Sequence, residues 1–155
     1  MKKYSAKNVL SRTKGVAIVE FIIVLPICLI LIMATAEFGR VFMQYNTLTK
    51  SVRGGVRYVA TNAIVGSTGV VGINGAVRAQ TQNLVVYGNT AGTGPAILPG
   101  LTTGAVAVAS PGNSRVSVSV TYPYGPIFVF IPGFFYGGDT STSYDLQAAV
   151  TMRAL

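Results

Sequence analysis

One apolar stretch constrains this chain more than any other feature. Residues 16–36 form a run of 21 positions in which Glu20 carries the only charge. About 20 apolar residues are enough for a helix to cross the hydrocarbon core of a bilayer. Pro26 lies inside the run, and a membrane helix tolerates proline because neighbouring groups satisfy the freed backbone. The sequence therefore predicts a transmembrane helix over residues 16–36.

The net charge of +8 is concentrated just before this stretch. Five of the twelve basic residues precede residue 16 with no acidic residue among them, so the remainder carries only +3. These five are Lys2, Lys3, Lys7, Arg12 and Lys14. A basic flank favours the cytoplasmic side of a membrane. Because the remainder shows no basic stripe interleaved with aromatic residues, we expect no nucleic-acid partner.

The chain is poor in side chains that perform catalysis or bind metals. It has no histidine, and its single cysteine, Cys28, lies inside the apolar stretch, so an intrachain disulfide is impossible. The acids after the stretch are Glu37, Asp139 and Asp145. A metal site, a Ser-His-Asp triad or a pair of catalytic carboxylates is not readily built from these residues. We therefore expect no enzymatic activity, metal or cofactor.

Two interpretations of the N-terminal region follow from general rules. Ala34-Thr35-Ala36 matches the small-x-small pattern of a signal-peptide cleavage site, which would release a secreted binding domain after Ala36. Against it, the apolar run is longer than the roughly 7–15 residues of such signals. An uncleaved membrane anchor is the second interpretation. It leaves Glu20 unexplained, because an acid at membrane depth is costly.

The third interpretation comes from a resemblance. Gly15 followed by Val16-Ala17-Ile18-Val19-Glu20-Phe21 resembles the processing site of the type IV pilin superfamily. Over residues 12–60 the chain resembles, more narrowly, the TadE-like pseudopilins of tight-adherence (Tad, Flp) pili. Further matching features are Leu25-Pro26, Glu37-Phe38-Gly39-Arg40, Arg53-Gly-Gly-Val-Arg57-Tyr58 and, more weakly, the final "SYDLQAAVTMRAL".

The resemblance implies roles for four residues. A prepilin peptidase would cut after Gly15, removing residues 1–15 as a cytoplasmic leader and leaving a new α-amino group on Val16. Glu20 would lie about 6 Å deeper along a helix. Its carboxylate would offset that amine in the same or a neighbouring subunit and so set subunit register, because a buried charge without a partner is strongly unfavourable. Phe21 would pack beside it.

The resemblance also implies a cellular role. The major pilin of these systems is much shorter, so this length indicates a minor pilin needed to assemble or anchor an adhesive pilus, with adhesion or biofilm formation as the result. The implied partners are the prepilin peptidase, other pilus subunits, the assembly platform and the bilayer. The implied location is the bacterial inner membrane, crossed once, with the C-terminal domain outside the cytoplasm. A pseudopilin of another secretion machine remains an alternative.

The helix is predicted to continue past the membrane over residues 37–60. Apolar residues recur there at spacings of three and four, which indicates one helical face. That face comprises Phe38, Val41, Phe42, Tyr45, Leu48, Val52, Val56 and Val59. It serves either as the core face of the head domain or as a surface that bundles with neighbouring subunits. Glu37 and Arg40 are expected subunit contacts, and Arg53 and Arg57 share a helix face without an assigned role.

Residues 61–155 are predicted to form an α+β head. A linker over 61–72 leads to a second helix that Asn74 caps and Gly88 ends, with Val77, Leu84 and Ile73 on one face. Apolar alternation then predicts antiparallel strands near 105–109, 116–122 and 144–152, with a turn at 110–113. The residues expected to share the inward side are Val116, Val118, Val120 and Tyr122 on the second strand and Tyr144, Leu146, Ala148, Val150 and Met152 on the last. The predicted fold is thus a long helix packed on a small antiparallel sheet.

The aromatic segment over residues 122–138 has two interpretations. It is either a loop folded over the sheet or a contact surface for another subunit or an adhesion target. Phe134 and Phe135 are the expected contacts, because aromatic residues are enriched at interface hot spots.

Overall fold

The computed structural model describes residues 7–64, 71–127, 130–131, 140–141 and 144–155. The expected contacts Phe134 and Phe135, like residues 1–6 of the leader, lie outside this part of the chain. The chain divides into two compact units, Met1–Gly39 and Arg40–Leu155. Below, the second unit is called the head.

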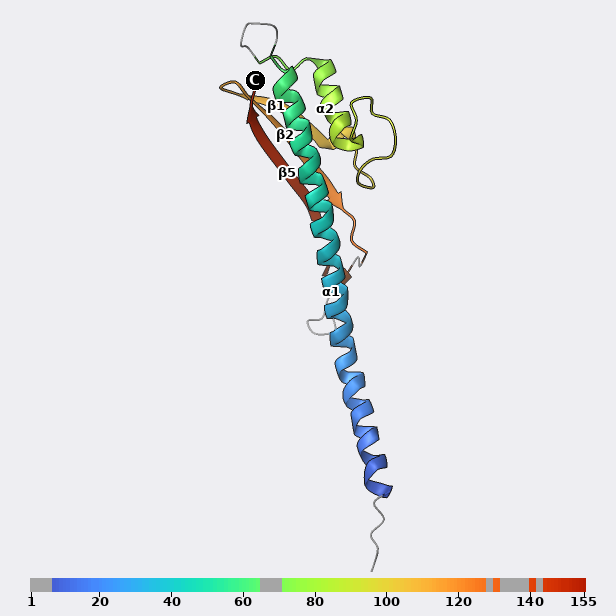
Figure 1. Ribbon diagram of the computed structural model, residues 1–155. Helices are drawn as coiled ribbons and strands as arrows, with labels where there is room; N and C mark the ends of the chain where they lie inside the picture. The colour runs from blue at the N-terminus through green and yellow to red at the C-terminus, as the bar shows by residue number, and fades with distance from the viewer. Residues whose placement is uncertain (1–6, 65–70, 128–129, 132–139, 142–143) are drawn as a thin grey trace, which may run out of the picture. The chain divides into compact units, whose positions relative to one another are not determined.

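Helix α1 runs from Lys7 to Asn62 and passes through Pro26 without ending (Figure 1). The prediction of a single long helix is confirmed, and the helix begins before Gly15. No residue from 16 to 36 is buried, whereas the later part of α1 carries a buried row. That row comprises Leu48, Val52, Val56, Val59 and Ala60, and Ala63, just after the helix, is buried as well.

The predicted helical face of α1 is only partly correct. Val41 packs against the core and Leu48, Val52, Val56 and Val59 are buried, as expected. Phe38, Phe42 and Tyr45 are instead exposed. At 100° per residue, Phe38 and Tyr45 lie within about 60° of Val41, on the same side of α1 as the buried Val52 and Val56. The spacing therefore gives the side of the helix, whereas burial depends on the position along it.

Helix α2 spans Gly75–Tyr87 and has the predicted ends. The Asn74 side chain accepts a hydrogen bond from the Val77 backbone N–H at 2.8 Å, which satisfies one free donor of the first turn. Gly88 follows in the left-handed conformation, with φ of 74°, and its N–H donates to the Leu84 carbonyl. The buried face differs from the prediction, because Leu84 and Ile73 are half-buried. Its members are Val77, Thr81, Val85 and Val86.

The main sheet has three antiparallel strands in the order β1-β2-β5. They span Val106–Gly112, Arg115–Tyr124 and Tyr144–Arg153, and a short 3₁₀ helix at Thr103–Ala105 precedes β1. Alternation holds along β2, where Val116, Val118, Val120, Tyr122 and Tyr124 are buried. The predicted α+β fold class is confirmed.

Two details of the sheet differ from the prediction. The β1–β2 turn consists of Asn113 and Ser114, both at φ of 53°, and lies beyond a register shift after Ala109, not at 110–113 as expected. On β5, Leu146 and Ala148 are buried, but Tyr144 and Met152 are exposed because they lie at the two ends of the strand.

The aromatic segment is not entirely loop. Its first three residues complete β2, and Phe130–Ile131 (β3) pairs with Thr140–Ser141 (β4) in a separate two-stranded sheet. Sequence analysis missed this pairing because prolines and glycines interrupt the apolar alternation on which strand prediction relies.

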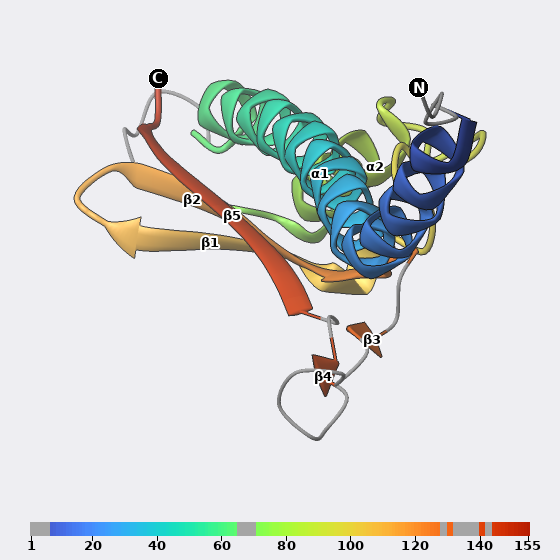
Figure 2. The same ribbon diagram turned by 90° about the horizontal axis from the view of Figure 1, so that it is seen from below.

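The head has two layers, with α1 and α2 on one face of the main sheet (Figure 2). At Gly55, α1 packs closely on α2 and β2, since a Cβ added there would lie 2.5 Å from Val85 Cγ2 and 3.8 Å from Val118 Cγ1. The Tyr58 hydroxyl donates to Gln80 Oε1 at 2.7 Å, which joins the two helices. The Leu155 N–H donates to the Ala60 carbonyl at 2.9 Å, so the end of the chain lies beside the end of α1.

Candidate functional site

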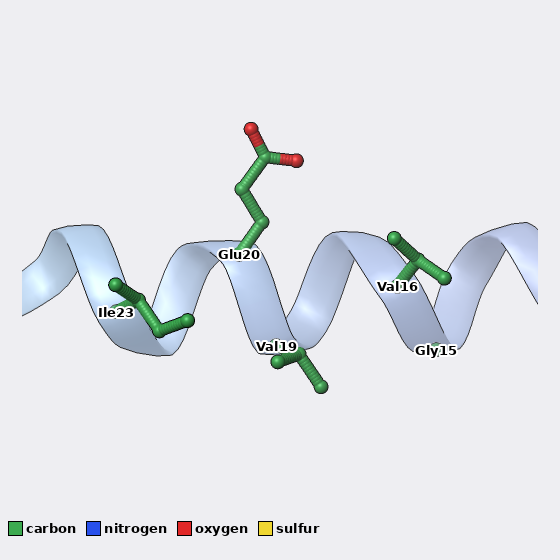
Figure 3. Close-up of a pocket in the computed structure, with 5 residues that line it drawn as sticks. All are labelled: Gly15, Val16, Val19, Glu20 and Ile23. Atoms are coloured by element: carbon green, nitrogen blue, oxygen red, sulfur yellow. The ribbon is translucent and has the colours of Figure 1, made fainter.

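The predicted cleavage and register residues lie together on the first half of α1. Val16 and Glu20 are four residues apart, so they lie on one side of the helix, about 6 Å apart along its axis. Together with Gly15, Val19 and Ile23 they line a shallow surface depression (Figure 3). A Cβ added at Gly15 would meet no other atom within 4 Å. The helix surface at the predicted cut is therefore open.

Glu20 is an exposed carboxylate on an otherwise apolar surface. It makes no hydrogen bond or ion pair with any residue whose side chain the structure describes, and Figure 3 shows its side chain extending away from the helix. Phe21 follows it and is 64% exposed. In a bilayer such a carboxylate requires a cation from outside this part of the chain, because an unpaired charge at that depth is costly.

A second cluster lies where α1 enters the head. The Arg40 guanidinium carbon is 5.9 Å from the centre of the Tyr124 ring, within the range of a cation–π contact. Tyr124 in turn stacks on Tyr144, with ring centres 5.1 Å apart and an angle of 29° between the rings. These tyrosines form the last pair of the β2–β5 ladder. Arg40, expected to contact another subunit, thus contacts its own sheet, and Glu37 is half-buried.

The later basic residues of α1 point to solvent. Arg53 and Arg57 are exposed, while Gly55 between them is buried against α2 and β2. The sequence analysis assigns no role to Gly55. Val52, three residues before it, and Val59, four residues after it, are both buried, and this spacing is the feature that would have placed Gly55 beside the buried row.

The described residues contain no group of three or more His, Cys, Asp or Glu side chains that can hold a metal ion. Cys28 is exposed on α1.

Comparison with known proteins bears on the first half of the chain. Among the described residues, one helix, within Gly15–Asn62, is long and apolar enough to cross a membrane. The family model for TadE-like protein matches residues 15–57. Residues 15–57 are TadE-like. The predicted resemblance is confirmed over that range, and it associates the chain with the Tad pilus.

The TadE-like segment begins at the predicted cleavage residue, Gly15, and includes both Glu20 and Arg40. It ends at Arg57, inside α1, so the second helix and the whole main sheet lie outside the matched range. No curated protein and no solved structure matches the chain.

Proposed function

We propose that this protein is a minor pilin of a Tad-type adhesive pilus, cut by a prepilin peptidase between Gly15 and Val16. The supporting observation is the TadE-like match, which begins at Gly15 and includes both Val16 and Glu20. The protein acts as a substrate of the peptidase and as a structural subunit. We assign it no catalytic role.

The cut changes the surroundings of Glu20. In the full chain Glu20 lies well inside α1, which begins at Lys7. After the cut it is the fifth residue of the chain, one turn from the new α-amino group of Val16. A carboxylate near a helix N-terminus is stabilised by the helix dipole, and it also attracts this amine. Glu20 therefore gains a cation that the full chain does not place beside it.

In the proposed role the α-amino group and Glu20 set subunit register. The charges are compensated within one chain or between neighbouring chains, and a subunit displaced along the helix axis leaves both uncompensated in an apolar environment. The leader stays in the cytoplasm, α1 crosses the inner membrane once, and the head lies outside the cytoplasm. Partners in assembly are other pilus subunits and the platform of the pilus machine.

Processing is tested by Gly15→Leu, with Gly39→Leu as its matched control. Both glycines lie on α1, and an added Cβ at either position meets no atom within 4 Å. We expect Gly15→Leu to accumulate as precursor and Gly39→Leu to be processed like the native protein, as measured by immunoblot. Normal processing of Gly15→Leu would contradict the proposed cleavage site.

The register role is tested by Glu20→Val, with Ile23→Val as a control in the same depression. We expect Glu20→Val to be processed but to leave cells without assembled pili, because the amine then lacks its carboxylate. Ile23→Val should assemble normally. Pili of normal number and length in the Glu20→Val strain, counted by electron microscopy, would show that Glu20 does not set register.

A further inference from the structure

The exposed surface of α1 changes chemistry inside the head. From Arg40 onward, its first exposed residues are apolar or aromatic, with Phe42 66% and Met43 72% exposed, followed by Tyr45. The next exposed side chains are the charged Lys50, Arg53 and Arg57. Exposed apolar side chains gathered in one place are typical of an interaction surface. On α1 they gather at the Arg40 end of the head, called its lower end below.

Aromatic residues of the sheet lie at the same level as this apolar part. The Arg40–Tyr124 contact and the Tyr124–Tyr144 stack place the end of the β2–β5 ladder beside the entry of α1. Figure 1 shows the tip of β2 and the start of β5 at the end of the sheet away from the β1–β2 turn. Tyr144 is 46% exposed, and Ile127, three residues after β2, is also exposed.

Chain connectivity limits how far this end of the head can be from the membrane. Arg40 follows the apolar stretch by only four residues. Four residues rise about 6 Å in a helix and reach at most about 14 Å when extended. The headgroup layer adds roughly 5–7 Å on each side of the hydrocarbon core. The Arg40–Tyr124–Tyr144 cluster therefore lies in or next to that layer.

We propose that the lower end of the head docks on the bilayer surface, with lipid headgroups and the upper acyl chains as its partner. The docking surface, named here the membrane rim, consists of Arg40, Phe42, Met43, Tyr45, Ile127 and Tyr144. This docking goes beyond the proposed function. It depends on the membrane span and does not depend on processing at Gly15.

The composition of the membrane rim fits lipid. Tyrosine is enriched at the membrane–water interface because its ring is apolar and its hydroxyl is polar. Arginine buries its aliphatic stem while its guanidinium stays at the polar level. The bilayer that the apolar stretch is long and apolar enough to cross is therefore a partner that the chemistry of the membrane rim also fits.

The absence of tryptophan from the chain allows a direct test with single-tryptophan variants. Tyr144→Trp reports on the membrane rim, and Met152→Trp is its matched control. Both positions are exposed on the same face of β5, and eight residues of strand separate them by about 26 Å. Leu29→Trp reports independently on insertion of the span, and Ile127→Trp is a second rim probe that leaves the tyrosine stack intact.

The full-length variants are reconstituted in phosphatidylcholine vesicles with and without bromine on the acyl chains near the glycerol. Compared with unbrominated lipid, brominated lipid should quench most of the tryptophan fluorescence of Leu29→Trp, Tyr144→Trp and Ile127→Trp. The fluorescence of Met152→Trp should be the same in both lipids. If Leu29→Trp were quenched but neither Tyr144→Trp nor Ile127→Trp were quenched, the span would be inserted in the bilayer but the head would not be docked on it. That result would overturn the proposal. Unquenched Leu29→Trp would overturn the span itself.

Two other results would also overturn the proposal. If Met152→Trp were quenched as strongly as Tyr144→Trp, the head would not be docked by its lower end. If the rim probes were insensitive to bromine but their emission shifted with the protein-to-lipid ratio, a second protein copy would cover the membrane rim in place of lipid.

Discussion

Two stretches of the same helix differ in what surrounds them. Residues 16–36 of α1 are apolar on every side, and none is buried within the chain. Residues 48–62 are apolar along one row, and Leu48, Val52, Val56 and Val59 are fully buried within the head. Both stretches form helix. The difference shows that helix formation alone does not decide whether an apolar residue faces protein or lipid.

The distribution of polar residues makes that distinction. In the later stretch Lys50, Arg53 and Arg57 are exposed between the buried positions, so water solvates one side while the sheet and α2 cover the other. In the earlier stretch a polar side hardly exists, and a helix that is apolar all round belongs in a core or a membrane. Substitutions in each stretch should therefore affect different properties of the protein.

Val56→Asp should have the largest effect on the head. Val56 is fully buried in the core, and an unpaired carboxylate there costs about 4 kcal/mol or more, enough to prevent a marginally stable domain from folding. Arg57→Asp, at the exposed neighbouring position, should leave a cooperative transition in near-ultraviolet circular dichroism. If Val56→Asp kept such a transition, the later stretch would not be the core element described here.

Gly55→Ala should destabilise the head, while Gly54→Ala should not. The added methyl at Gly55 overlaps Val85, and overpacking of this kind costs roughly 1–3 kcal/mol. Gly54 has no atom near its added Cβ, so alanine there should stabilise the helix by up to about 1 kcal/mol. Thermal unfolding in detergent micelles measures both. Shifts of the same sign would mean that α1 does not approach α2 and β2 as closely as described.

Asn74→Ala tests whether α2 is needed to enclose the later stretch. Loss of the bond to the Val77 N–H should lower stability by about 1 kcal/mol, whereas Asn74→Asp retains the acceptor and adds a favourable charge at the helix start. Chemical denaturation of the two variants gives the difference. Equal stability of Asn74→Ala and the native protein would show that this cap does not contribute.

Ile23→Ala should have the smallest effect on the head. Ile23 is 66% exposed in the Met1–Gly39 unit, so its truncation should change the unfolding free energy of the head by less than about 0.5 kcal/mol. Head unfolding in micelles tests this directly. A loss comparable to that of a buried valine would mean that the earlier stretch stabilises the head after all.

Much of the fold was predictable because its rules are local. Asn74 marks the start of α2 as its N-cap, and Gly88 marks its end as a left-handed residue. Strict alternation predicted which side of β2 faces inward. Prediction failed where tertiary packing decides. The burial of Thr81 in place of Leu84 depends on where α2 meets Gly55, and the exposure of Phe42 depends on how far the head extends along α1.

The functional residues divide in the same way. Glu20 was conspicuous because a charge in an apolar run is a local anomaly, and Gly15 was singled out by the resemblance to a pilin processing site. The Arg40–Tyr124–Tyr144 cluster joins residues more than eighty positions apart, and no periodicity along the chain indicates such a contact. The contact of Arg40 with another subunit stays a prediction, and its contact with Tyr124 could be found only from the fold.

The central claim is that the mature protein begins at Val16, where the new amine lies one turn from Glu20. Intact-mass analysis of the protein from its native cells, with N-terminal sequencing, measures this directly. The account predicts a mature chain that begins with Val16. A chain that begins at Glu37 would identify a cleaved signal peptide, and one that retains the leader would identify an uncleaved anchor, so either result would contradict the account.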